Sequence, residues 1–173
     1  GLYCAFDQCA MGEGTEKCAQ AHGLVSEHMD AMAAESHRRA DAAQQRGVFA
    51  DEIVTVTIPQ RRGDALIVGH DEGVRGETTI ESLAGLRPAF DTNGHITAGN
   101  ASQISDGASA MLLGSERAAT SLGREPVARI AGRGASALEP QRFGFAPVAA
   151  ADRALDRAGI TWADVGAVEL NEA

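Results

Sequence analysis

The stretch TAGNASQISDGASAMLLGSE, residues 97–116, divides the chain into two parts of different character. Its first half, up to Gly107, is rich in Gly, Asn and Ser and has no helical period, which predicts an ordered loop. Loops of this composition serve two purposes. They bind small ligands, or their Asn and Asp side chains stitch a turn that holds two domains together. Because the residues that follow alternate between strand and helix patterns, we place a domain boundary near Gly107.

The part after the boundary predicts an α/β layer. Three short apolar runs are typical of buried strands, and two further stretches are typical of helices that end at glycine, the first of them capped by Ser115. In chain order these elements are expected at 111–114, 115–123, 127–131, 147–158 and 165–170. Strands and helices that alternate in this way form parallel sheets through right-handed crossovers. Residues 107–173 are therefore predicted to be an incomplete α/β unit.

The part before the boundary, residues 1–106, predicts an α+β domain. Helices are expected at 15–21, 26–46 and 79–86, with Ser26 and Thr79 as N-caps, and strands at 52–58 and 64–68. The turn between the two strands is expected at Arg61-Arg62-Gly63. This order predicts two helices, a hairpin and a short helix.

Composition excludes several classes of protein. The 173 residues are 44% hydrophobic and 23% charged, which suits a folded chain of one or two domains. The net charge of -9 argues against nucleic-acid binding, since phosphate contacts need clustered Lys and Arg. No membrane-spanning run or signal sequence is recognisable, which predicts a cytoplasmic protein without a membrane partner. Gly1 and Ala173 read as cut ends.

The three cysteines and Gly132-Arg133-Gly134 are weaker candidates for a site. Cys4, Cys9, Cys18 and His22 could form a four-ligand zinc set, but their spacing is not that of a known finger or ribbon, so no metal is predicted. Reduced cysteines suit a reducing compartment, and none has a neighbouring base that would make it a nucleophile. The glycine pair lacks the third glycine of a dinucleotide-binding loop.

Several motifs together resemble the thiolase family. They are residues 97–116, VELNEA at 168–173, MGEGTEKCAQ at 11–20 and DEIVTVTI at 51–58, in the family's order and spacing along essentially the whole chain. The resemblance implies a thiolase-like α/β fold, with residues 1–106 as the loop domain that covers coenzyme A and 107–173 as the truncated start of the C-terminal half. It also implies transfer of acyl groups between thioesters of coenzyme A.

The resemblance assigns roles to individual residues. Arg75 matches an arginine that lies against the coenzyme A nucleotide. Ala98, Ser102 and Ile104 match positions along the pantetheine arm, and Leu2 and Phe143 match apolar pocket positions. Asn171, after the last expected strand, matches the asparagine that holds a water of an oxyanion hole, and is the expected catalytic residue. Coenzyme A and acetyl-CoA are implied as substrates, with no permanently bound cofactor and with a homodimer or homotetramer as the assembly.

Departures from the family pattern limit the acyl specificity that can be expected. Ala10 stands where many acetyl-transferring members have histidine, and Gln103 and Ser105 replace Gly and Asn in the loop. The tails FGFAP, 143–147, and ITWADVGAVELNEA, 160–173, look closest to thiolases that act on 3-oxoadipyl-CoA in aromatic catabolism. The family's nucleophilic cysteine is expected before Gly1, and its histidine and second cysteine after Ala173. The chain alone is therefore expected to be inactive, and a non-catalytic coenzyme A-binding module is the alternative.

Overall fold

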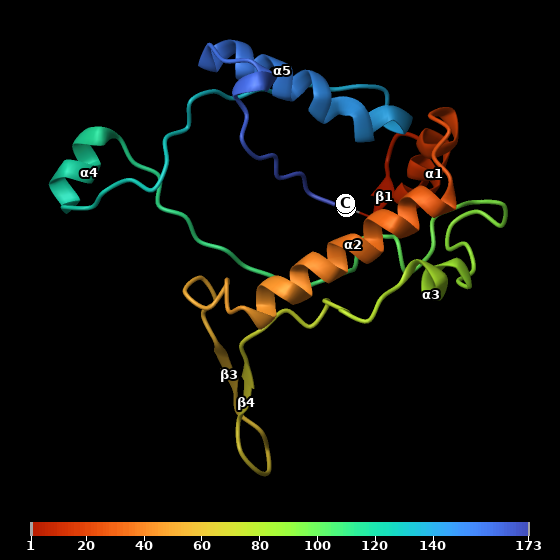
Figure 1. Ribbon diagram of the computed structural model, residues 1–173, viewed down its shortest axis with the longest axis horizontal. Helices are drawn as coiled ribbons and strands as arrows, with labels where there is room; N and C mark the ends of the chain where they lie inside the picture. Colours follow the sequence, from red (N-terminus) through yellow and green to blue (C-terminus); the bar gives the residue numbers. More distant parts are fainter. Residues whose placement is uncertain (1, 173) are drawn as a thin grey trace. The chain divides into compact units, whose positions relative to one another are not determined.

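The computed structural model describes residues 2–172 (Figure 1). These residues form two compact units. One unit contains residues 2–18 and 104–172, and the other contains residues 19–103. Helix α1 (Met11–Ala21) begins in the first unit and ends in the second. The family domains predicted at 1–106 and 107–173 are defined by sequence and stay a prediction.

The first unit starts with a tight hairpin. Strands β1 (Tyr3–Cys4) and β2 (Cys9–Ala10) are antiparallel, with Tyr3 opposite Ala10 and Cys4 opposite Cys9. The Met11 amide donates to the Leu2 carbonyl at 3.0 Å and closes the hairpin onto the start of α1.

Two predicted helices of the first unit are confirmed together with their ends. Helix α4 (Glu116–Leu122) starts where the Ser115 hydroxyl accepts the Ala118 amide at 3.2 Å, and Gly123 ends it with a φ of 59°. Helix α5 (Ala146–Ala158) follows the 3-10 turn η1 (Pro140–Phe145), and Gly159 ends it with a φ of 70°. A second 3-10 turn, η2 (Trp162–Asp164), comes next. Glycine tolerates these left-handed conformations because it has no Cβ.

The three strands predicted at 111–114, 127–131 and 165–170 are wrong as elements of this structure. None of these segments forms a strand ladder with another described segment. Their apolar side chains are exposed, as in Met111 at 85% and Leu170 at 63%. A strand is stabilised by hydrogen bonds to a neighbouring strand, so an apolar pattern without a paired neighbour remains irregular.

Gly132 and Gly134 have a packing role that the sequence did not reveal. Any Cβ at these positions would collide with backbone carbonyls of α5, those of Ala154 and Ala150 respectively. The segment is also held to α5 by the Arg157 guanidinium, which donates to the Arg133 carbonyl at 2.7 Å. The absence of side chains therefore allows residues 131–135 to lie directly against the helix.

The second unit contains the long helix α2 (Ser26–Gln45), the hairpin of β3 (Val56–Ile58) and β4 (Leu66–Val68), and the short helix α3 (Ile80–Ala84). Strands β3 and β4 form a long hairpin (Figure 1). Its register pairs Val56 with Val68 and Ile58 with Leu66, and its turn contains Gly63 as predicted. The strands are shorter than predicted, because residues 52–55 and 64–65 make no ladder. Ser26 is the first helical residue of α2, whereas it was predicted to be the N-cap; Val25 has that position.

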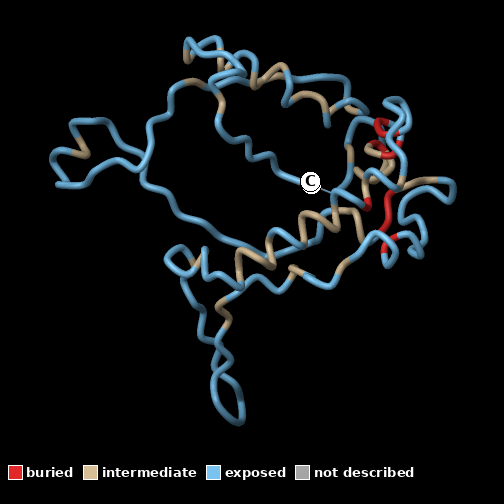
Figure 2. The backbone as a smooth tube through the Cα atoms, viewed as in Figure 1, coloured by how far each residue is buried: buried red, intermediate tan, exposed pale blue. Residues whose placement is uncertain are grey.

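Few residues are buried within the described chain, as the sparse red segments of Figure 2 show. The buried apolar residues are Cys18, Ala19, Leu83 and Ile96. Buried polar residues accompany them, namely Glu16, Asp30 and Thr97. None of the helices within residues 2–172 combines the length and apolar composition needed to cross a bilayer.

Candidate functional site

The loop that follows His95 is tied to helix α2 by Asn100. The Asn100 amide nitrogen donates to the Asp30 carboxylate at 2.9 Å and to the His95 carbonyl at 3.1 Å. The Asn100 oxygen accepts the Thr97 backbone amide at 2.8 Å. Asp30 is only 3% exposed, so its carboxylate depends on such donors to offset the loss of water. Asn100 therefore stitches the turn within residues 19–103, whereas the expectation that this loop holds two domains together stays a prediction.

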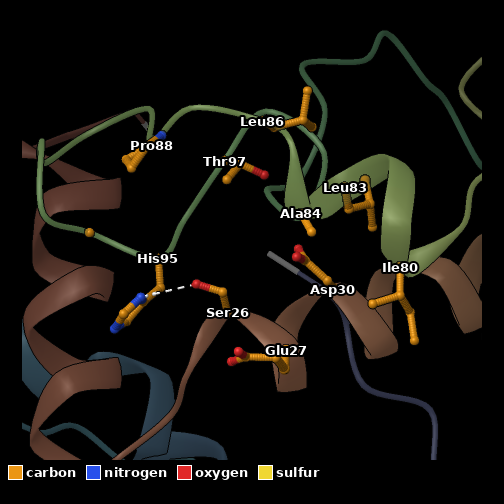
Figure 3. Close-up of a pocket in the computed structure, with 11 residues that line it drawn as sticks. Ser26, Glu27, Asp30, Ile80, Leu83, Ala84, Leu86, Pro88, His95 and Thr97 are labelled. Carbon is orange, nitrogen blue, oxygen red and sulfur yellow. Dashed lines mark hydrogen bonds between the residues drawn. The ribbon is translucent and has the colours of Figure 1, made fainter.

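One hollow, between the start of α2, α3 and the loop, is lined by polar groups that already bond one another. Figure 3 shows the Ser26 hydroxyl beside the His95 ring, with 3.1 Å between Oγ and Nδ1. Asp30 points into the same space from α2 and is held by Asn100. Leu83, Leu86 and Pro88 supply the apolar side. The hydrogen bonds around this hollow therefore anchor the loop on α2.

A second, open hollow of about 380 Å³ brings together Arg75 and Ala98, two of the residues that the sequence assigned to coenzyme A. Its volume falls within the range of about 300 to 1,000 Å³ that is usual for small-molecule sites. The wall also includes His37 of α2, Ser82 and Leu83 of α3, and Gly99. Arg75 and Ala98 are both exposed, so their surfaces are open to a ligand.

The Arg75 guanidinium has no hydrogen-bond or ion-pair partner within residues 2–172. By contrast, Arg38 and Arg39 of α2 both form ion pairs. Arg38 and Arg39 donate to Glu35 and, by these hydrogen bonds, lower the pKa of that carboxyl to about 2. Arg75 is therefore a positive group that is available to an anionic ligand.

Three hydrogen bonds fix the loop that carries Arg75 to the rest of its unit. The Arg75 backbone amide donates to Nδ1 of His37 at 3.2 Å. The side chain of Gln103 donates to the Gly73 carbonyl at 2.8 Å, and that of Gln44 donates to the Asp71 carbonyl at 3.3 Å. These bonds join residues 71–75 to α2 and to the end of the 97–103 loop, so the two sides of the hollow are connected.

Helix α3 contributes Ser82 and Leu83 to the lining of the hollow and begins with a capping box. Thr79 Oγ1 accepts the Ser82 amide, and Ser82 Oγ accepts the Thr79 amide, both at 3.1 Å. Hydrogen bonds from the backbone and from Thr79 lower the pKa of Glu81 in the first turn. Reciprocal caps of this kind satisfy backbone donors that have no partner inside the helix. The Thr79 cap was predicted from the sequence, and its partner Ser82 was not.

The remaining predicted site residues do not join this hollow. Ser102 lies three residues after Gly99, the last lining residue of the hollow, and is exposed. The others belong to the first compact unit, which contains residues 2–18 and 104–172. There, Ile104 is 86% and Leu2 69% exposed, Phe143 is half-buried in η1, and Asn171 is exposed in the segment after η2.

Sequence reasoning missed His37, Glu77, Thr78 and Ser82 as lining residues. The contact of His37 with Arg75 joins positions 38 apart in the chain, and no local pattern signals it. Glu77 and Thr78 lie close to Arg75 in sequence and could have been included as its neighbours.

The zinc set that was considered at the start of the chain is not assembled. Within residues 2–172 no group of three or more His, Cys, Asp or Glu side chains is placed to hold a metal ion. Cys18 is buried in α1, while Cys4 and Cys9 lie in the β1–β2 hairpin.

Comparison with known families identifies the class of protein. The thiolase N-terminal domain matches residues 1–117, and the thiolase C-terminal domain matches residues 124–173. The chain therefore belongs to the thiolase family, and the thiolase-like α/β fold class is confirmed.

Individual relatives agree with this assignment. The chain is 46% identical over 173 residues to the acetyl-CoA acetyltransferase of Thiocystis violacea and 45% identical to a probable acetyl-CoA acyltransferase of Staphylococcus aureus (strain COL). All of the chain is aligned, and it spans 44% of each relative's length.

Solved structures show the same likeness. The acetyl-CoA acetyltransferase of Bacillus anthracis matches with a TM-score of 0.90 at 35% identity, over 95% of this chain and 41% of that one. Human mitochondrial 3-ketoacyl-CoA thiolase matches with a TM-score of 0.88 at 34% identity, over 99% of this chain and 43% of that one.

Replacing Asn100 with alanine is expected to destabilise the protein by about 2 to 4 kcal/mol, because Asp30 would keep its buried charge without the amide donor. Asn93→Ala, at an exposed position of the preceding turn, should change stability by less than about 0.5 kcal/mol. Chemical denaturation of the intact protein measures both. Equal effects of the two variants would contradict the anchoring role of Asn100.

Proposed function

We propose that the intact protein is an acyltransferase of the thiolase type. It cleaves 3-oxoacyl-CoA with coenzyme A to release acetyl-CoA, or runs the reverse Claisen condensation. The observation that carries the proposal is the open hollow that is lined both by Arg75, whose guanidinium has no partner within residues 2–172, and by the small residues Ala98 and Gly99. Coenzyme A has the matching chemistry: a highly phosphorylated nucleotide and a slender, mostly neutral arm.

In this proposal, Arg75 binds the nucleotide end of coenzyme A. Arginine suits phosphate because its planar group donates several hydrogen bonds at once and stays charged at every physiological pH. Ala98 lacks a bulky side chain, so the pantetheine arm can pass close to the loop backbone. Ser102 and Ile104 are proposed as further contacts along that arm, and Leu2 and Phe143 as apolar pocket residues, on the strength of their match to the family's positions.

Asn171 is the proposed catalytic residue. Its amide would hold a water molecule that donates to the thioester oxygen as this oxygen gains charge. In the family the reaction is ping-pong: a cysteine outside these residues takes the acyl group, coenzyme A departs, and a second cysteine transfers protons. The substrates are thioesters of coenzyme A, and no permanently bound cofactor is needed.

Two further properties rest on the family resemblance or on composition alone. A homodimer or homotetramer is proposed for the intact protein, together with the cytoplasmic location that its composition predicts. The alternative function is binding of coenzyme A without turnover. The match of Asn171 to the family's oxyanion-hole position favours the enzyme, because a binding module has no use for such a residue.

Arg75→Ala in the intact protein should raise the KM for coenzyme A by about tenfold to one hundredfold, because a charge-assisted contact to phosphate is lost. The kcat at saturating coenzyme A should change much less. Arg62→Ala, which removes an exposed arginine in the β3–β4 turn, is the matched control and should leave KM unchanged. An unaltered KM in Arg75→Ala would rule out the proposed nucleotide contact.

Asn171→Ala should lower kcat by on the order of 10²-fold, since one oxyanion-hole contact is lost, while KM for the acyl substrate stays similar. Steady-state thiolysis of acetoacetyl-CoA measures both constants. Glu169→Gln changes a neighbouring exposed side chain without touching the amide and serves as the control. A kcat for Asn171→Ala equal to that of the control would remove Asn171 from the mechanism.

The finer substrate proposal is 3-oxoadipyl-CoA. It rests on the resemblance of segments 143–147 and 160–173 to thiolases that act on this substrate. It predicts a higher kcat/KM with 3-oxoadipyl-CoA than with acetoacetyl-CoA in parallel thiolysis assays. The relatives' names, by contrast, refer to acetyl-CoA transfer. A clear preference for acetoacetyl-CoA would overturn the finer proposal and keep the acyltransferase, whereas no thiolysis of either substrate would favour the binding module.

A further inference from the structure

The β1–β2 hairpin places two cysteines directly opposite each other. In its antiparallel register Cys4 pairs with Cys9, and the four residues between them form the loop. Directly opposed residues of an antiparallel pair project from the same face, so the two thiols are neighbours. Both side chains are partly exposed, and both sulfurs are free thiols.

This pairing meets the geometric requirement for a disulfide. Opposed residues in an antiparallel pair have Cα atoms about 4.5 to 5.5 Å apart. Disulfides span Cα separations of about 4.4 to 6.8 Å, so the backbone need not move far to bring the sulfurs into bonding distance.

The hairpin loop is internally fastened, which keeps the register in place. The Tyr3 hydroxyl donates to the Gln8 carbonyl at 2.6 Å, and the Gln8 side chain donates to the Ala5 carbonyl at 2.5 Å. The Asp7 amide lies 3.4 Å from Cys4 Sγ and donates to it. Because the loop is short and held in place, each thiol has a high effective concentration near the other, which favours ring closure.

We propose that Cys4 and Cys9 form a modification site: they join in an intrachain disulfide when the protein meets a low-molecular-weight disulfide such as oxidised glutathione. One cysteine thiolate attacks a sulfur of glutathione disulfide, forms a mixed disulfide and releases one glutathione. The other cysteine thiolate then attacks the protein sulfur of that bond and releases the second glutathione. The two thiols together lose two electrons and two protons, and the oxidant gains them.

The surroundings of Cys9 set the pH dependence of the reaction. Partial burial is the main reason that the pKa of the Cys9 thiol is raised, and Glu13 raises it further while Lys17 opposes this. Cys4 and Asp7 also face Cys9 and raise its pKa. Since the thiolate is the reacting form, ring closure should become faster as the pH rises above neutrality.

The chain offers a matched internal control and a convenient cleavage site. Cys18 is 8% exposed in α1 and has no cysteine opposite it. Trypsin cuts after Lys17, so Cys18 leaves on a different peptide from Cys4 and Cys9.

The experiment treats the intact protein with oxidised glutathione, alkylates the remaining thiols, digests with trypsin and measures peptide masses. The peptide that ends at Lys17 should lose both alkylation sites, be lighter than its reduced form by two hydrogen atoms, and give no backbone fragments between Cys4 and Cys9. Cys18 should stay alkylated. In Cys9→Ser, the reaction should stop with one glutathione on Cys4.

Two results would overturn the proposal. One is complete alkylation of Cys4 and Cys9 after treatment. The other is a product in which each carries its own glutathione or is linked to a different cysteine. Neither result depends on catalytic activity, so the acyltransferase proposal is tested separately.

Discussion

The buried carboxylate of Asp30 is the constraint on which the site depends. A charge that is 3% exposed needs donors, and Asn100 provides one from the loop that closes the site. The same Asn100 side chain bonds the His95 carbonyl and the Thr97 amide, so a single residue fixes both the shape of the turn and its place on α2. Ala98 and Gly99 reach the open hollow from this fixed turn, and their position follows from the anchor.

Among the arginines of this unit, some are paired with a carboxylate and Arg75 is not. Arg38 and Arg39 are engaged by Glu35, and the low pKa of Glu35 reflects that pairing. Arg75 lies on a loop fixed by its backbone, through its amide and His37, which leaves the guanidinium available. Because the loop is held by contacts to its main chain, its charged side chain remains free to bind a ligand. This arrangement is suited to a phosphorylated ligand.

Local signals in the sequence predicted local structure well. Ser115, Gly123, Thr79 and Gly159 act within one turn of their helices, and each stands where it was expected to begin or end a helix. The strands at 111–114, 127–131 and 165–170 failed because a strand is completed by a partner that may be far away in sequence, and the apolar pattern does not name that partner. Gly132 and Gly134 lack the third glycine of a dinucleotide-binding loop, and their spacing alone does not reveal their contact with α5.

The site was accessible from sequence only in part. Family motifs pointed to Arg75 and Ala98, which the structure brings into one hollow, whereas the long-range contact of His37 had no local signature. The most direct test of this site is amide hydrogen exchange of the intact protein with and without coenzyme A. Slower exchange at residues 73–79 and 97–103 in the presence of coenzyme A is the result that this site predicts. Unchanged exchange in both segments, with protection elsewhere, would contradict it.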